Sequence, residues 1–309
     1  MSNSYRLASL TNTRFEGDVI EEFVRHTLRF VDRMFVIDNV APDRTREILD
    51  RLVAEGLPVT IWESFELDDL TGDITRFARR AFAEDACDYL FVLDADEFLR
   101  PAGRDALERS LALLPAEAHA TLPWVTYVPT WGDVASDSVL ASIRYRMADE
   151  PIAFSKIVVA RSFANRPSAE IAPGFHGITD TYGDPAVVPL ADAAIAHFPV
   201  RSIPQLQGKA FLGWSSFLLV GNEDSHTMGA QWRRLYEELR RDADWTPEDL
   251  YYFARTYLDI GRTNPDLVFD PMPTVERRYP FPVPPMAELA LTYIQSLSDY
   301  CLRLRGDAR

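Results

Sequence analysis

Three carboxylates follow one strongly apolar run of the chain. Residues 89–93 read Tyr-Leu-Phe-Val-Leu, and Asp94, Asp96 and Glu97 come directly after them. Two carboxylates one residue apart can point to a common centre and coordinate a hard divalent cation, Mn²⁺ or Mg²⁺, that also grips a diphosphate. A bare Asp-x-Asp pair can equally be a solvated strand end that caps the next helix, so the surroundings decide between the two interpretations. Residues 94–97 are called the acidic turn below.

The residues before the acidic turn predict a parallel sheet with crossover helices. Short apolar runs at 34–37, 59–62 and 89–93 alternate with amphipathic stretches such as 73–85, a rhythm typical of α/β folds. Open α/β sheets bind ligands at the carboxyl ends of their strands. We therefore expect Asp38 and Asn39, which follow the run at 34–37, to lie near the acidic turn.

The rest of the chain predicts more strands and then helices. Strand-like runs occur at 121–128 and 156–161, Thr246-Pro-Glu-Asp249 is a helix start, and the proline-rich segment 271–285 precedes a final helix at 286–304. We predict an α/β fold with a Rossmann-like mixed sheet and flanking helices. Residues 1–228 are expected to form a catalytic domain, and residues 229–309 a helical C-terminal extension packed on it.

Charge limits the class of partner. The chain has 47 acidic and 32 basic residues and a formal net charge of -15, which repels a polyphosphate backbone and argues against a nucleic-acid partner. An anionic nucleotide sugar is repelled too, unless a divalent cation or well-placed Lys and Arg side chains compensate for its charge. A donor site in this protein therefore needs local positive charge.

Cysteine usage and hydropathy predict where the protein works. Cys87 and Cys301 are far apart and suggest reduced thiols. The first ten residues do not resemble a signal peptide, and no run of about 18 apolar residues occurs. We expect a cytoplasmic protein without a membrane span.

The residues around the acidic turn carry a family resemblance. The segment Phe91-Val-Leu-Asp-Ala-Asp-Glu-Phe98 resembles the donor-site signature of family 2-like glycosyltransferases with the GT-A fold, in the subgroup with an LDADEF-type motif. Segments containing Asp38-Asn39, Gly174-Phe-His176 and His197-Phe-Pro-Val-Arg-Ser202 are similar to the same subgroup, so that the resemblance covers about residues 7–215. The chain departs from it at 11–16, where relatives usually have an Asn-Glu pair.

The resemblance implies roles for individual residues. Asp38 and Asn39 would read the nucleoside of a nucleotide-diphosphate sugar, and Asp94 and Asp96 would hold the metal. His176, or alternatively His197, would complete the metal sphere. Further contacts to the donor would come from a set of cations in both halves of the chain: Arg76, Arg79, Arg201 and Lys209.

Sugar transfer with inversion also needs a carboxylate base for the acceptor hydroxyl. Glu223 and Asp224 are similar to the acidic pair that supplies this base in the family, and Glu97 and Asp180 are competing candidates. The acceptor expected by analogy is a carbohydrate or a lipid-linked glycan, in surface polysaccharide or glycoconjugate synthesis. Trp131, beside Gly132, is expected to line the acceptor cleft.

Three other functions use similar features. A transferase-like domain without turnover could bind a glycan or a protein partner. Haloacid-dehalogenase-like phosphatases also have a strand that ends in Asp-x-Asp, but that motif normally opens their fold, whereas three strand-like runs precede it here. Nucleotidyltransferases that make sugar nucleotides carry a Gly-rich first loop, which residues 10–17 lack.

Overall fold

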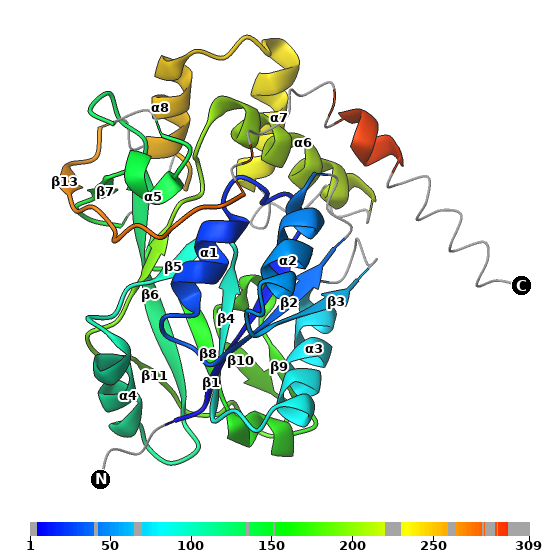
Figure 1. The fold of residues 1–309 in the computed structure, drawn as a ribbon, viewed down its shortest axis with the longest axis vertical. Helices are drawn as coiled ribbons and strands as arrows, with labels where there is room; N and C mark the ends of the chain where they lie inside the picture. The colour runs from blue at the N-terminus through cyan, green and yellow to red at the C-terminus, as the bar shows by residue number, and fades with distance from the viewer. Residues whose placement is uncertain are drawn as a thin grey trace, which may run out of the picture.

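The structure is a computed structural model. It describes residues 5–39, 43–64, 70–133, 136–150, 152–219, 230–258, 264–279, 281, 288 and 290–295 (Figure 1). Statements about structure below concern these residues.

Four parallel strands form the first half of the central sheet. Their order is β3-β2-β1-β4, so all four end at the same edge, here called the carboxyl edge. Their bounds are Leu7–Thr13 for β1, Arg33–Asp38 for β2, Val59–Glu63 for β3 and Tyr89–Asp94 for β4.

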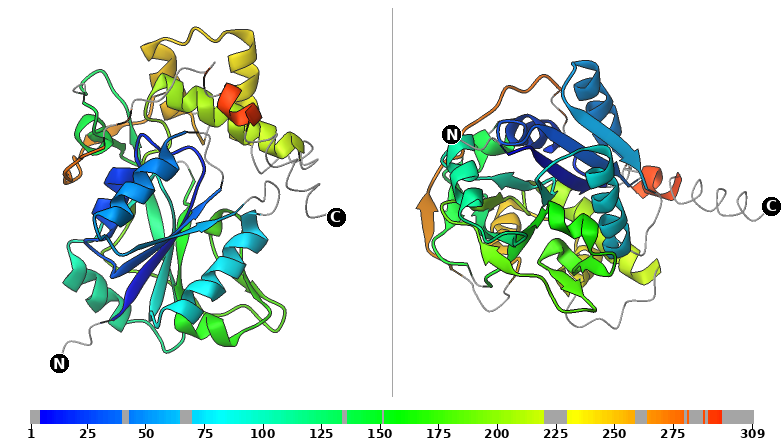
Figure 2. Two further views of the ribbon diagram at one scale, coloured as in Figure 1. Left: turned by 45° about the vertical axis from the view of Figure 1, so that its right-hand side comes forward. Right: turned by 90° about the horizontal axis from the view of Figure 1, so that it is seen from below.

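Helices cover both faces of this sheet (Figure 2). Alternate strand residues are buried against the helices on opposite faces. Leu7, Val36 and Phe91 pack with α1 (Ile20–Thr27) and α2 (Thr45–Ala54). Their neighbours in sequence point the other way and pack with α3 (Leu70–Glu84). Both faces are therefore apolar, which explains the continuous apolar runs of these strands.

The second half of the sheet is mixed. Strand β8 (Ser155–Ala160) is antiparallel to β4, and β6 (His119–Val128) is antiparallel to β8. Short elements complete this half: β5 (Glu97–Leu99), α4 (Arg104–Ala112), α5 (Val139–Ser142), β7 (Tyr145–Met147), η1 (Arg161–Asn165), β9 (Ala169–Ile171), η2 (Pro173–Phe175), β10 (Ile178–Asp180), β11 (Val187–Pro189) and β12 (Ile195–His197). The prediction of an α/β fold with a mixed sheet and flanking helices is confirmed.

The C-terminal third adds α6 (Ile203–Leu219), α7 (Ala230–Arg241), α8 (Pro247–Arg255) and β13 (Leu267–Phe269), with the three helices gathered at one end of the molecule (Figure 1). Helix α8 begins at a capping box between Thr246 and Asp249, as the sequence predicts. The extension is not purely helical, because β13 pairs with β7. The predicted boundary at 228 and most of the predicted helix at 286–304 lie outside the described residues.

The two predicted parts share one hydrophobic core. Val128, Met147 and Leu206 pack with Leu235 and Phe253 of α7 and α8.

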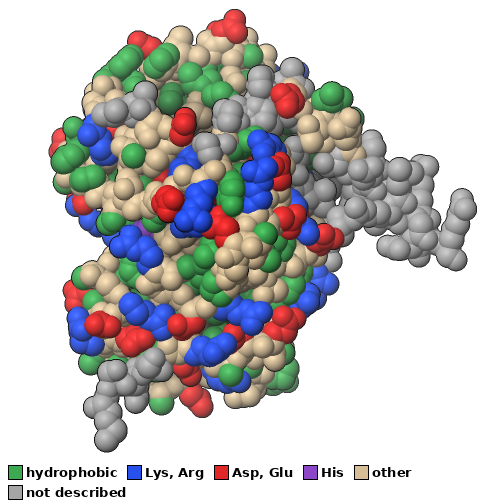
Figure 3. Space-filling model, in the orientation of Figure 1, with side chains coloured by type: hydrophobic (Ala, Val, Ile, Leu, Met, Phe, Trp, Pro, Cys, Tyr) green, Lys and Arg blue, Asp and Glu red, His purple; other side chains and the backbone are tan. Residues whose placement is uncertain are grey.

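On the face shown in Figure 3, basic and acidic side chains are interspersed, in keeping with the ion pairs that Glu47 of α2 forms with two arginines. No described helix combines the length and the hydropathy that a membrane span needs.

Two buried histidines outside the acidic turn make stability depend on pH. Burial lowers the pKa of His26 and of His119 from 6.5 to about 4, and Nδ1 of His119 accepts the Ala160 N–H at 2.9 Å. Because the folded-state pKa lies below the unfolded one, the stabilisation is present above pH 6.5 and is lost as the pH falls toward 4.

Between pH 7 and pH 5, we expect the free energy of unfolding of wild type to fall by up to about 2 kcal/mol more than that of His119→Gln, since one pKa unit corresponds to about 1.4 kcal/mol. Urea unfolding of both proteins at the two pH values measures this difference. A difference that does not change with pH would contradict a neutral, buried His119.

Candidate active site at the carboxyl edge of the sheet

The acidic turn lies where the chain topology concentrates polar groups. Strand β4 ends in Asp94, β2 ends in Asp38, and β1 leads into Glu16 and Asp18. Strand β8 runs in the opposite direction, and its pairing of Val158 with Phe91 places the start of β8 at this same edge. Groups from distant parts of the sequence therefore meet here.

Asp94 forms an ion pair with a buried lysine. Its carboxylate lies 2.6 Å from Lys156 Nζ, which also lies 3.4 Å from Glu97 Oε1. The Asp94 side chain is 42% exposed, whereas that of Lys156 is 2% exposed. Lys156 Nζ also faces the ring of Phe175 at 4.7 Å, an arrangement that suits a desolvated ammonium group. One end of this ion pair is thus open to a ligand and the other is closed.

Glu97 supports the acidic turn from within. It is fully buried, and its Oε2 accepts the Asp94 N–H at 2.9 Å. Burial, with additional repulsion from Asp94 and Asp96, raises the pKa of Glu97 well above its usual value. A buried carboxyl group engaged in this way fixes the conformation of the turn and offers no surface to an acceptor sugar.

Asp96 is buried and meets two cations. Its carboxylate accepts a hydrogen bond from Lys209 of α6 and another, at 3.3 Å, from Arg201. Burial favours the neutral carboxyl, but Lys209, His197 and Arg201 outweigh it and hold the pKa of Asp96 well below its usual range. The second aspartate of the turn is therefore a carboxylate held by fixed positive charges.

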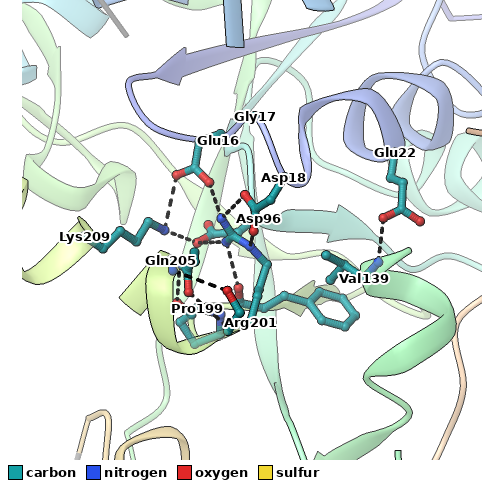
Figure 4. Close-up of polar contacts among 12 residues, drawn as sticks. Glu16, Gly17, Asp18, Glu22, Asp96, Val139, Pro199, Arg201, Gln205 and Lys209 are labelled. Carbon is teal, nitrogen blue, oxygen red and sulfur yellow. Dashed lines mark hydrogen bonds and ion pairs between the residues drawn. The ribbon is translucent and has the colours of Figure 1, made fainter. Parts of the chain in front are cut away.

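Arg201 joins Asp96 to the loop between β1 and α1. Its guanidinium donates to Asp18 at 2.7 and 2.8 Å and to Glu16 at 2.7 Å. Lys209 Nζ lies 3.2 Å from Glu16 as well. Figure 4 shows Arg201 between Glu16, Asp18 and Asp96, with Lys209 reaching Glu16 and Asp96 from α6.

The two candidate histidines are held by backbone and by rings. Nδ1 of His176 donates to the Ser155 carbonyl at 2.7 Å, which leaves Nε2 as the basic nitrogen. His197 lies opposite Glu97 in the β5–β12 pair and stacks on Trp124 at 4.3 Å. Burial lowers the pKa of His197 to about 4, so its imidazole is neutral at pH 7.

The predicted metal ligands do not form a ready-made metal centre. Within the part of the chain that the structure describes, no group of three or more His, Cys, Asp and Glu side chains is arranged to hold a metal ion. The residues present still fit a hard divalent cation, because Asp94 offers a partly exposed carboxylate oxygen. Mg²⁺ and related ions are commonly held by one or two carboxylates plus substrate phosphates. A cation here would thus need its remaining ligands from a bound molecule such as a phosphate.

The predicted nucleoside contacts lie at the end of β2. Asp38 is buried, and its carboxylate lies 3.4 Å from the guanidinium of Arg46 of α2. The same guanidinium lies 2.7 Å from the Glu63 carboxylate. The Asn39 N–H donates to the Thr13 carbonyl at 2.9 Å, which ties the end of β2 to the end of β1. Residues 40–42, within the predicted nucleoside motif, lie outside the described residues.

Of the two predicted arginines of α3, Arg79 lies away from the acidic turn. Arg79 donates to the carbonyls of Arg166 at 3.0 Å and Ala169 at 2.6 Å. These carbonyls follow η1, which begins where β8 ends at the opposite edge of the sheet. The structure therefore does not bring Arg79 to the acidic turn, and Arg76 lies over the ring of its neighbour Phe77 at 5.1 Å.

Three residues of this site, Lys156, Glu16 and Asp18, have no role predicted from the sequence. Lys156 had a signal, because it is a lysine at the start of the otherwise apolar strand Ser155–Ala160. Glu16 and Asp18 had none, since acids in a loop are normally solvated. The predicted bases Glu223 and Asp224 lie outside the described residues.

Comparisons with known proteins give similarity in structure only. No family model matches the chain, and no curated protein matches it. Staphylococcus aureus TarS 1-349, in complex with UDP, is 10% identical with a TM-score of 0.37 over 83% of this chain and 88% of that chain. The mannosyltransferase PcManGT from Pyrobaculum calidifontis, with GDP-Man and Mn²⁺, is 13% identical with a TM-score of 0.37 over 96% and 88% of the chains. GalNAc-T7, with UDP, GalNAc and Mn²⁺, is 11% identical with a TM-score of 0.35 over 63% and 44%.

Proposed function

We propose that this protein is a glycosyltransferase that moves a sugar from a nucleotide-diphosphate donor to a hydroxyl of a carbohydrate or lipid-linked acceptor. The observation that carries the proposal is the composition of the carboxyl edge. An exposed Asp94 and a partly exposed Lys209 lie on neighbouring segments of one cluster, with Asp38 at the end of β2. These are the groups that a diphosphate and a ribose require.

Charge within the cluster supports a divalent cation. Five carboxylates, those of Glu16, Asp18, Asp94, Asp96 and Glu97, meet three cations, Lys156, Arg201 and Lys209. The net charge is minus two when every group is ionised, and protonation of Glu97 and Glu16 brings it no higher than zero. A donor diphosphate therefore finds no surplus positive charge, and we propose that Mn²⁺ or Mg²⁺ at Asp94 and Asp96 provides it.

Each group then has a chemical task. The cation, when bound, would stabilise the charge that develops on the departing nucleoside diphosphate. Lys209, whose ammonium has three N–H bonds and meets two carboxylates, retains one N–H for a phosphate oxygen. His176 remains a proposed additional ligand because its Nε2 carries the lone pair. Glu223 or Asp224 remains the proposed base for an inverting transfer.

A thermal-shift screen of UDP, GDP and dTDP sugars, with Mn²⁺ and with chelator, tests the proposal. A ligand at 100 times its Kd stabilises the folded state by about 2.7 kcal/mol, so the correct donor should raise Tm, and more in Mn²⁺. Turnover of that donor in the presence of acceptor glycans separates an enzyme from a domain that only binds. A protein whose Tm responds to none of these nucleotides would contradict the proposal.

An exposed aromatic side chain suggests where the acceptor lies. Trp131 is 67% exposed and packs edge-on against Tyr251 of α8 at 4.6 Å. Aromatic rings of this kind stack on the apolar face of a pyranose. We propose that Trp131 contacts the acceptor, and we expect Trp131→Ala to raise KM for the acceptor while leaving KM for the donor unchanged.

A further inference from the structure

Arg201 differs from every other cation of the site in that its hydrogen-bonding capacity is used up. A guanidinium has five N–H bonds. Nε donates to Asp18, Nη1 donates to Asp96 and to the Phe198 carbonyl, and Nη2 donates to Glu16 and Asp18. The side chain is 2% exposed. No N–H remains for a phosphate, so the role expected from the sequence, a contact to the donor, does not fit this geometry.

The partners of Arg201 come from three separate segments. Glu16 and Asp18 belong to the loop between β1 and α1, Asp96 to the acidic turn, and Phe198 to the segment that follows β12. The backbone of Arg201 is itself fixed, because its N–H donates to Gln205 Oε1 at 3.0 Å. A planar group that bonds several carboxylates at once also fixes their relative orientation.

Electrostatics explains why this position needs an arginine whose five N–H groups are all used in hydrogen bonds. Glu16, Asp18 and Asp96 are three carboxylates gathered in a small, buried volume. Without Arg201, Lys209 is the cation among the described residues that still forms ion pairs with these carboxylates, at Glu16 and Asp96. An arginine that satisfies the carboxylates leaves Lys209 available.

We propose that Arg201 is a positioning residue: its five N–H bonds lock the β1–α1 loop to the acidic turn, so that Asp96 and Lys209 are held ready for the donor. This inference rests on the proposed function for its kinetic consequences. The lock itself is a structural claim, which can be tested separately.

The kinetic test compares Arg201→Lys with Lys209→Met. Lysine keeps the charge of Arg201 but cannot join three segments, so we expect kcat to fall by about 10- to 100-fold, with a much smaller change in KM for the donor; displacements of about 1 Å have effects of this size. Lys209→Met should instead weaken binding of the nucleoside diphosphate found in the screen. If Arg201→Lys keeps wild-type kcat, positive charge alone suffices and the lock is wrong.

Hydrogen–deuterium exchange tests the lock without any reference to activity. In Arg201→Lys, amides of residues 14–19 and 94–98 should exchange faster than in wild type, and those of α2 should not change. Arg25→Gln is the matched control, because Arg25 pairs with Glu21 and Glu55 outside the site; it should leave both site segments and kcat unchanged.

A second variant covers the case in which Arg201→Lys does not fold. Asp18→Asn removes one of the two oxygens that accept from Arg201 and keeps the other, so it should accelerate exchange at 94–98 although residue 18 lies outside that segment. Unchanged exchange there would overturn the proposal. If wild type transfers no sugar but the exchange pattern is as expected, the proposed function fails and the lock stands.

Discussion

Asp94→Asn is expected to lower kcat/KM for sugar transfer by about 10²- to 10³-fold, the size of effect seen when one preorganised electrostatic group is removed. The amide keeps the shape of the side chain and an oxygen for Lys156, but it cannot balance a cation or its bound diphosphate. Because the Asp94 side chain is 42% exposed, we expect the unfolding free energy to fall by no more than about 2 kcal/mol. Kinetic assays and urea unfolding of the same preparation measure both effects.

Glu84→Gln is the matched control for this variant. Glu84 is a carboxylate of comparable exposure, 38%, and forms an ion pair with Arg80 at 2.7 Å on α3. Its replacement should leave kcat/KM unchanged. Full activity in Asp94→Asn would remove the acidic turn from the catalytic site.

Lys156→Met is expected to have the largest effect on stability, lowering the free energy of unfolding by about 3–5 kcal/mol, because it removes the buried partner of the ion pair with Asp94. The side chain of Lys156 is 2% exposed, and that of its second partner, Glu97, is fully buried. Removal of the ammonium leaves Glu97, whose pKa is already raised by burial, without its counter-charge, so the group must either stay ionised in the interior or take up a proton. Urea unfolding at pH 7 measures the loss.

A double-mutant cycle separates this explanation from simple loss of packing. Lys156→Met combined with Glu97→Gln replaces the ionisable partner by a neutral side chain, so the double variant should recover a substantial part of the stability that the single variant loses. If the two losses simply add, Lys156 and Glu97 do not interact energetically, and the ion pair at 3.4 Å has no effect on stability.

The sequence predicts the elements of the first half well, for reasons that are local. The runs at 34–37, 59–62 and 89–93 are short, apolar and bounded by polar residues or by Gly and Pro, and they form β2, β3 and β4. Helix α8 is predictable because its cap, from Thr246 to Asp249, lies within four residues of sequence. Patterns of this kind are visible in a single chain.

Elements that depend on distant partners were not predictable in this way. Strands β5, β7 and β12 have three residues each and form only through pairing with other strands. Strand β12 pairs with both β5 and β6, and β7 pairs with β6. Nothing in three residues of sequence signals such pairing. The strand β13 within the predicted helical extension has the same origin, since it forms on β7.

The site shows the same division. Asp94 and Asp96 stand out because they follow an apolar strand, whereas the partners of Arg201 are about 100 to 185 positions away in sequence, apart from Phe198. Glu97 looked like a free acid, but the β5–β12 pairing buries it. Arg79 looked close to the acidic turn in sequence, but α3 runs back across the sheet and carries it to the other edge.

The most direct test of the account is a crystal structure of the protein with Mn²⁺ and the nucleoside diphosphate that the screen identifies. We predict a diphosphate at the carboxyl edge, between Asp94 and Lys209, with a cation on the acidic turn and the ribose near Asp38. A nucleotide bound elsewhere, with Asp94 still paired only to Lys156 and no ion beside it at saturating Mn²⁺, would contradict the assignment of this edge as the donor site.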